Sequence, residues 1–320
     1  MDYRQLGRSG LRVSRILLGT WNFGKVIAET ESHTLLDRAY DAGINVVDTA
    51  NEYGRGTSET YIGNWLAKVG GRRDHLVIAT KVFGAMSDRP NDGGLSARHI
   101  RHAAEQSLRR LRTDHIDIYQ LHHVDRCTPW DEIWQAMRLL IAQGKILYVG
   151  TSNHAGWQLA QGQEAAQRHC SLGLLSEQCL YNLAERTAEQ EVIPAAGAYG
   201  IAVLPWSPLH GGMLAGVLGA DANLGRRRRT GRAAKSLVSH RDQVQRYEDV
   251  CAKYAFAPAE VALAWLLARP EVTAPVIGPR IMEHLESALR ATELILPSDL
   301  HRELEDIFPG PGPAPESFAW

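Results

Sequence analysis

The chain has 320 residues, a hydrophobic fraction of 44% and a formal net charge of −1 at pH 7. This charge balance gives no electrostatic reason to expect nucleic acid or a membrane surface as a partner. No apolar run reaches the roughly 18 residues that a membrane span needs, and the N-terminal sequence has no signal-peptide core. We therefore expect a cytoplasmic protein with a large buried core.

The four cysteines are scattered along the chain and show no spacing typical of metal ligands. They are Cys127, Cys170, Cys179 and Cys251. Cysteines in a cytoplasmic protein are expected to stay reduced. The sequence therefore predicts free thiols in the core or at the surface, and it predicts no metal site.

Short β-branched runs alternate with helical patterns along the chain. The predicted strands are 15–20, 44–50, 75–81, 115–122, 145–153, 172–178, 201–207 and 272–278. The predicted helices are 33–43, 58–70, 97–111, 129–144, 154–169, 188–200, 242–255, 259–269 and 281–292. Strict alternation predicts parallel strands with right-handed crossovers, and eight strand–helix units favour an α/β fold of the closed (β/α)8 TIM-barrel type.

The remaining segments complete this prediction. The N-terminal YRQLGRSGLRVS predicts a hairpin around a Ser-Gly turn, which we expect to plug the barrel floor. No Pro/Ser/Gly-rich linker divides the chain, so we expect residues 1–320 to form a single domain. We expect irregular structure in Asp221–Ser239, as one of several long active-site loops. The tail FPGPGPAPESFAW is too rich in Pro and Gly to predict a helix.

Four polar side chains fall at or just beyond the ends of three consecutive predicted strands. Asp48 ends the second strand, Tyr53 lies five residues further on, Lys81 ends the third strand and His122 ends the fourth. In a barrel these positions share the C-terminal face, where function is found. A charged residue that closes an apolar run is expected to be buried and to need a partner. A purely structural Asp–Lys pair is the alternative, but four such residues on adjacent strands favour one site.

The sequence resembles a known family in these same segments. NVVDTANEYG, ATK and DIYQLHHVD resemble the signatures of the aldo-keto reductase superfamily, and TSN and PWSPL fit the same family. The resemblance covers nearly the whole chain in the right order. It implies an NADPH-dependent oxidoreductase that reduces an aldehyde or ketone to an alcohol. The implied catalytic residues are Asp48, Tyr53, Lys81 and His122, with His123 turned toward the substrate.

The chemistry of these residue types fits that reaction. Hydride transfer to a carbonyl produces an alkoxide that needs a proton, and we expect Tyr53 to supply it. We expect the Lys81 ammonium to lower the tyrosine pKa by about three units at about 4 Å. Asp48 would keep Lys81 charged, and His122 would hydrogen-bond the carbonyl oxygen. A lyase that uses Lys81 as a Schiff base is an alternative, but it requires an uncharged lysine.

No G-x-G-x-x-G fingerprint follows the first predicted strand, so the sequence does not predict a Rossmann dinucleotide site. The resemblance instead implies that Ser152, Asn153 and Gln178 bind the nicotinamide carboxamide and that Trp206 stacks on the ring. Helix caps and a core tryptophan are the alternative interpretations. The full set implied to contact the cofactor is Gly19, Thr20, Trp21, Ser152, Asn153, Gln178, Trp206, Ser207, Pro208, Leu209, Gly211, Gly278, Arg280 and His284.

The phosphate end of the cofactor would lie beside the segment GPRIMEHLESAL, which begins a predicted helix. Arg280 would pair with a 2′-phosphate, so NADP is favoured over NAD. The chain departs from the family pattern at His284, Ser287 and Ala288, where Gln or Arg and a Glu-Asn pair are usual. The glycine-containing loop His210–Gly216 resembles the family's loop over the pyrophosphate.

Four side chains are expected to line the substrate mouth: Trp21, Phe23, Phe83 and His123. The substrate is a small-molecule carbonyl, and the chain also resembles bacterial members associated with deoxysugar biosynthesis, which suggests a keto-deoxysugar nucleotide. The run Arg226–Arg229 is either a solvated loop or an anion clamp for the cofactor phosphates or for a phosphorylated substrate. The alternative function is an NADPH-binding regulatory subunit of a membrane channel with vestigial catalysis. A homo-oligomer is compatible with either function.

Overall fold

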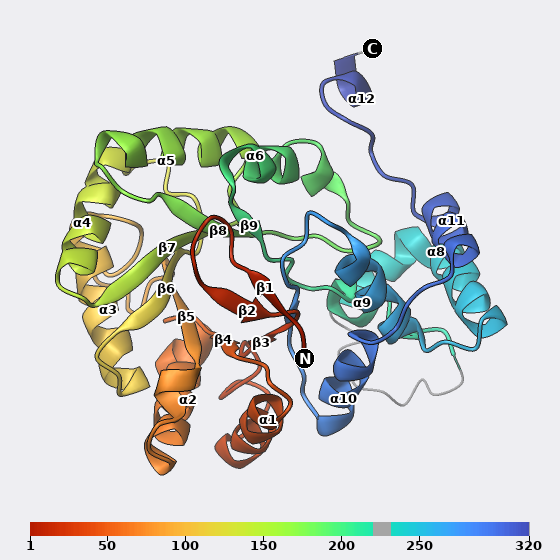
Figure 1. Cartoon of the computed structure of the whole chain (residues 1–320), viewed down its shortest axis with the longest axis horizontal. Coiled ribbons are helices and arrows are strands. Elements are labelled where there is room, and N and C mark those ends of the chain that lie inside the picture. Colours follow the sequence, from red (N-terminus) through yellow and green to blue (C-terminus); the bar gives the residue numbers. More distant parts are fainter. Residues whose placement is uncertain (220–231, 320) are drawn as a thin grey trace.

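The computed structural model describes residues 1–219 and 232–319, and the run Arg226–Arg229 lies outside them. Eight strands form one parallel sheet in the order β10-β3-β4-β5-β6-β7-β8-β9 (Figure 1). The strands are β3 (Leu17–Gly19), β4 (Val46–Asp48), β5 (Val77–Val82), β6 (Ile116–Leu121), β7 (Ile146–Ser152), β8 (Leu174–Gln178), β9 (Ala202–Val203) and β10 (Val276–Ile277). All eight coincide with predicted strands.

The two edges of this sheet approach each other, so the sheet curls on itself as a (β/α)8 fold requires. Parallel bridges join Val203 to Val272 and Trp206 to Val276. The amide of Val276 also donates to the carbonyl of Pro205 at 2.8 Å. Because all strands run the same way, their carboxyl ends lie on one face, and the loops that follow them converge there.

Helices surround the sheet (Figure 1). They are α1 (Glu29–Asp41), α2 (Thr57–Lys68), α3 (Ala97–Leu111), α4 (Trp130–Ala142), α5 (Gly156–Arg168), α6 (Val192–Tyr199), α8 (Arg232–Lys253), α9 (Pro258–Ala268), α10 (Met282–Ala291), α11 (Ser298–Ile307) and α12 (Glu316–Ala319). Short 3-10 turns occur at η1 (Tyr53–Gly56), η2 (Arg72–His75), η3 (Thr187–Glu189) and η4 (His210–Gly212). The main core lies between the outer face of the sheet and these helices.

The N-terminal hairpin closes the bottom of the barrel, as predicted. Strand β1 (Tyr3–Gln5) pairs antiparallel with β2 (Arg12–Ser14). Leu6 and Val13 from this hairpin are fully buried in a second core cluster inside the barrel, together with the inward-facing residues Leu17, Val46, Val77, Ala79, Ile118, Leu175, Ala202, Leu204, Ala274 and Val276. The interior of the barrel is therefore a packed core and not a pore.

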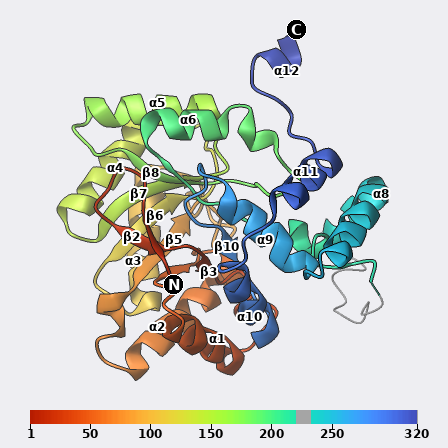
Figure 2. The same ribbon diagram turned by 45° about the vertical axis from the view of Figure 1, so that its right-hand side comes forward.

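Three expectations about the C-terminal third need correction. Residues 232–239 are the first turns of α8 and are not irregular. Helix α11, which packs on α8, was not predicted, although Leu300, Leu304 and Ile307 bury one helical stripe. The tail does contain a helix, because α12 begins at Glu316, beyond the last proline of the tail. Both views show α12 projecting away from the barrel (Figures 1 and 2).

Within residues 1–219 and 232–319, no single helix has both the length and the apolar composition to cross a membrane. The one combination that passes the same criteria is the pair Ala233–Lys253 and Pro258–Ala268, whose axes are bent by 93°. Part of this pair consists of ordinary core helix, since Val261 to Leu267 are all buried.

The closest approach of α2 to the end of α3 requires a glycine at position 63. A Cβ atom there would lie 2.1 Å from the carbonyl oxygen of Arg110. We predict that Gly63→Ala lowers the free energy of unfolding by about 1–3 kcal/mol, the usual cost of overpacking. Gly197→Ala in α6 is the matched control, because a Cβ there meets nothing within 4 Å. Urea unfolding of both variants should separate them, and equal stabilities would contradict this account.

Candidate active site

A buried ion pair lies where β4 and β5 end. The Lys81 side chain is fully buried, and its Nζ donates to Oδ2 of Asp48 at 2.6 Å and to the carbonyl of Thr49 at 2.8 Å. The strand register explains this pair. Asp48 lies opposite Ala79, and Lys81 follows two residues later, so both side chains point to the same face of the sheet. The predicted partnership between these two charges is therefore present.

Two glutamines also bind the Asp48 carboxylate. Gln120 of β6 and Gln178 of β8 each donate from Nε2 to Oδ1 of Asp48 at 2.9 Å. Gln120 is not among the predicted site residues, and Gln178 was predicted to bind the cofactor carboxamide. Gln120 lies two residues before His122, which directly follows the same strand, and this period of two was the signal that could have identified it. With three donors, Asp48 is held in one orientation and its negative charge is stabilised.

The hydroxyl of Tyr53 completes this cluster. Tyr53 begins η1, directly after the loop that follows β4, and its Oη lies 3.4 Å from Nζ of Lys81. Burial raises the pKa of Tyr53, and the nearby Lys81 charge only opposes this effect. The expected lowering of this pKa is therefore wrong. A tyrosine with a raised pKa remains protonated at neutral pH and so retains the proton that an acid must donate.

Lys81 itself remains charged. Burial by itself lowers its pKa, but Asp48 and Tyr53 act in the opposite direction, and the net result is a pKa raised above the ordinary lysine value. A Schiff-base mechanism needs a neutral amine. The surroundings of Lys81 therefore disfavour the lyase alternative.

His122 lies beside Tyr53, one residue beyond β6. The two rings are 5.7 Å apart in an edge-to-face arrangement. Burial, together with the charge of Lys81, lowers the pKa of His122 to about 2, so the imidazole is neutral near pH 7. His123 is exposed, stacks on His122 and contacts the ring of Phe83. The structure thus brings Asp48, Lys81, Tyr53 and His122 together.

The predicted nicotinamide residues lie beside this cluster and bond to one another. Ser152 Oγ donates to the carbonyl of Gln178 at 2.8 Å. Asn153 donates from Nδ2 to the carbonyl of His122 at 3.1 Å and accepts the indole N–H of Trp206 at 3.0 Å. Hydroxyl, amide and indole groups therefore line the rim from β7 to β9, next to His122. This set of donors and acceptors suits a carboxamide and an aromatic ring.

The other cofactor residues occupy two ends of the same rim. At the end of β3, Gly19 and Thr20 are buried, and the Thr20 hydroxyl donates to the carbonyl of Asp48 at 3.0 Å. Trp21 is 42% exposed and carries the ammonium of Lys25 over its ring. Phe23 is fully buried in the main core, so it does not line the mouth as expected. Core packing, which cannot be read from the sequence of this loop, decides that difference.

The phosphate-side residues follow β9 and β10. Ser207, Pro208, Leu209 and Gly211 form the turn after β9, in which Ser207 Oγ accepts the amide of Gly211 at 3.0 Å. Gly278 accepts a hydrogen bond from Asn22, and Arg280 and His284 stand at the start of α10.

The positions that depart from the family pattern have other contacts. Ser287 donates to Glu260 of α9, and Ala288 is buried in the core.

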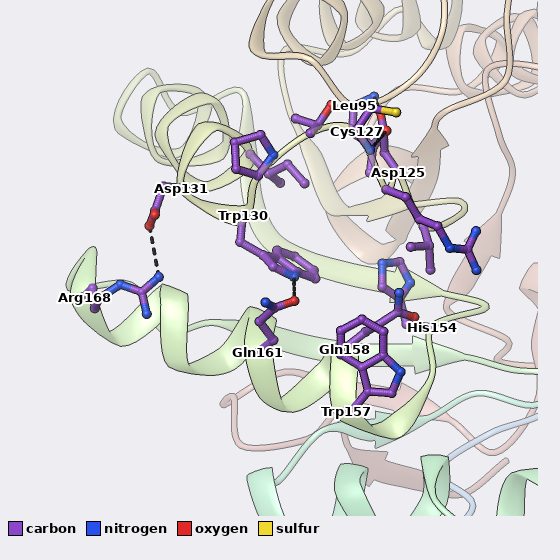
Figure 3. Close-up of a pocket in the computed structure, with 15 residues that line it drawn as sticks. Leu95, Asp125, Cys127, Trp130, Asp131, His154, Trp157, Gln158, Gln161 and Arg168 are labelled. Carbon is purple, nitrogen blue, oxygen red and sulfur yellow. Dashed lines mark hydrogen bonds and ion pairs between the residues drawn. The ribbon is translucent and has the colours of Figure 1, made fainter.

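A cavity of about 510 Å³ lies beside the cluster and not over it. It is bounded by Leu95, by the loop after β6, by the start of α4 and by one side of α5 as far as Arg168 (Figure 3). Trp130, His154 and Trp157 surround it, and none of the four clustered residues lines it. A second cavity, of about 350 Å³, is lined by Asn51, His99 and Arg110 among others. The chemistry therefore centres on the rim of the barrel and not in either cavity.

Comparison with known proteins agrees with this geometry. Residues 15–308 match the aldo/keto reductase family. The chain belongs to that family.

Among its relatives is the uncharacterized oxidoreductase YrpG of Bacillus subtilis (strain 168), which is 48% identical over 100% of both chains. Versiconal hemiacetal acetate reductase of Aspergillus parasiticus is 33% identical, with 96% of this chain and 97% of the relative covered. A probable voltage-gated potassium channel subunit beta of Oryza sativa subsp. japonica is 33% identical over 92% of each chain.

The Lys81–Asp48 pair makes a testable contribution to stability. We predict that Asp48→Asn lowers the free energy of unfolding by about 3–5 kcal/mol, because it leaves a buried ammonium without its counter-charge. The double variant Asp48→Asn/Lys81→Met should recover most of that loss, since it removes both charges. Urea denaturation of the wild type, both single variants and the double variant forms a complete cycle. Additive losses would show that the two charges are not coupled.

Proposed function

We propose that this protein is an NADPH-dependent carbonyl reductase that converts an aldehyde or ketone to an alcohol. The observation that carries the proposal is the cluster in which Lys81 Nζ contacts both the Asp48 carboxylate and the Tyr53 hydroxyl. Such a reaction needs a proton for the newly formed alkoxide, and Tyr53 is a protonated, partly buried donor at the rim.

Each residue of the cluster has a separate role in the proposed reduction. When bound, the cofactor supplies the hydride. Tyr53 donates its proton to the carbonyl oxygen, and the charge of Lys81, which Asp48 orients, stabilises the tyrosinate that remains. A neutral His122 hydrogen-bonds the same oxygen and fixes its orientation. Burial of the ion pair strengthens these interactions relative to water.

The residues present fit a nicotinamide dinucleotide. Ser152, Asn153 and Trp206 supply hydroxyl, amide and indole groups beside His122, and these residues would hold the nicotinamide. Arg280 precedes the first turn of α10 and would bind the 2′-phosphate of NADPH, assisted by the helix N-terminus. The preference for NADPH over NADH rests on Arg280, since Ser287 and Ala288 have contacts elsewhere.

The substrate proposed is a small-molecule carbonyl that enters past Trp21, Phe83 and His123. More specifically, we propose a keto-deoxysugar nucleotide as the substrate, because the chain resembles bacterial members of the family associated with deoxysugar biosynthesis.

We also propose that the chain acts as a single cytoplasmic domain, with a homo-oligomer compatible with the fold. The channel-subunit alternative follows from relatives such as the probable potassium channel subunit beta. The complete Asp48–Lys81–Tyr53–His122 cluster favours an enzyme.

Tyr53→Phe is expected to remove the acid while keeping the ring. We predict a loss of about 10²–10⁴-fold in kcat for aldehyde reduction, the usual contribution of a general acid. NADPH affinity, measured by tryptophan fluorescence quenching, should stay within about twofold of the wild type, a difference below about 0.5 kcal/mol. Tyr61→Phe in α2 is a matched control that removes a hydroxyl outside the cluster. Unchanged turnover in Tyr53→Phe would overturn the assignment.

Arg280→Ala tests the cofactor preference. A charged hydrogen bond to the 2′-phosphate is worth about 1.5–3 kcal/mol, so NADPH affinity should fall roughly tenfold or more. NADH affinity should change little, because NADH lacks that phosphate. Titration calorimetry with both cofactors gives the ratio. An equal loss for the two would show that Arg280 does not recognise the phosphate.

A further inference from the structure

Glu52, the residue before Tyr53, lies against His122. Its Oε1 is 3.3 Å from Nδ1 of the imidazole. This nitrogen is buried and makes no hydrogen bond of regular geometry with the described residues, and the Glu52 carboxylate lies within ion-pair distance of it. Two successive residues of one loop, Glu52 and Tyr53, therefore both lie against His122.

The absence of a side chain at Gly84 makes room for this arrangement. A Cβ atom at position 84 would lie 1.6 Å from Oε2 of Glu52, which is too close for two non-bonded atoms. Glu52 thus rests directly over the Gly84 backbone, in the loop after β5. Its side chain remains 37% exposed, so the carboxylate can exchange protons with solvent.

The proton on His122 depends on what faces each ring nitrogen. A neutral imidazole carries one N–H, and the other nitrogen accepts. Because Nδ1 faces Glu52, Nε2 is the nitrogen left for a substrate oxygen. An ionised carboxylate keeps the proton on Nδ1 and leaves Nε2 as an acceptor. A protonated carboxyl donates to Nδ1 and leaves the proton on Nε2, which then donates.

We propose that Glu52 is a positioning residue that acts through His122 and selects whether Nε2 donates or accepts at the substrate oxygen. This inference rests on the proposed carbonyl reduction. Reduction needs Nε2 as a donor to the carbonyl, which is the state with Glu52 protonated. Alcohol oxidation needs Nε2 as an acceptor, which is the state with Glu52 ionised. The same pair therefore biases the direction of the reaction with pH.

The surrounding charges restrict the protonation states that the Glu52–His122 pair can adopt. Lys81 and Tyr53 lie on one side of His122 and His123 stacks on another, while Asp48 is held by Lys81. Burial and Lys81 together disfavour the doubly protonated imidazolium. Because the imidazolium is disfavoured, the protonation of the Glu52 carboxyl decides which nitrogen of His122 carries the proton. Reduction should decline as the pH rises, and oxidation should increase.

The first test is the pH profile of kcat for the reduction of 4-nitrobenzaldehyde by the NADPH-loaded enzyme. In the wild type, kcat should fall at least about tenfold as the pH rises, as expected for loss of one essential proton. Glu52→Gln removes the ionisation, so this decline should disappear while KM changes little. Gly84→Ala displaces the carboxylate and should give the same flattened profile.

Glu29→Gln is the matched control, because Glu29 lies 3.6 Å from His33 on α1, in a similar pair outside the cluster. It should keep the wild-type profile. A Glu52→Gln enzyme whose kcat follows the wild-type pH dependence would overturn the inference. An enzyme that reduces no carbonyl at any pH would instead contradict the proposed function.

A second test does not need turnover. Nitrogen-15 NMR of histidine-labelled protein distinguishes the two imidazole tautomers, and a His122→Asn variant identifies the signals of His122. At pH 8 the wild type should carry its proton on Nδ1, and Glu52→Gln should move that proton at least partly to Nε2. The same tautomer in both proteins would refute the role of Glu52, whatever the activity of the enzyme.

Discussion

The ion pair between Lys81 and Asp48 lies inside the barrel mouth, where water reaches neither side chain. Removing two charges from water costs several kcal/mol each, and only close contacts with good geometry offset that cost. Here the contacts come from four strands, because Lys81, Gln120 and Gln178 all donate to an aspartate at the end of β4. The ends of these strands are thereby fixed relative to one another, and the positions of Tyr53 and His122 follow.

That buried pair also sets the protonation of its neighbours. Lys81 stays charged, Tyr53 stays protonated and His122 stays neutral near pH 7, each as a result of burial combined with the charges around it. A protonated phenol beside a fixed ammonium is an acid whose conjugate base is already stabilised. The described residues contain no cluster of three or more metal-ligating side chains.

The fold determines where the site lies, and the arrangement of the site residues is the evidence for function. Parallel strands bring their carboxyl ends to one face, while the N-terminal hairpin fills the other end with Leu6 and Val13. Relatives with similar identity carry the names of a reductase and of a channel subunit, so membership of the family does not by itself decide between catalysis and regulation. The intact cluster is the feature that favours catalysis in this chain.

The sequence by itself determined the eight strand–helix units, the hairpin, and the placement of Asp48, Lys81 and His122 at strand ends, because local periodicity specifies which residues close a strand. The segments that carry these residues also showed the resemblance to the aldo-keto reductase superfamily. Only the tertiary structure decided that Gln120 and Gln178 bind Asp48, that Phe23 belongs to the core, that the pKa of Tyr53 is raised, and that Glu52 reaches His122 over Gly84. Burial and charge at a site come from elements far apart in the chain, and their balance is set only when those elements pack together.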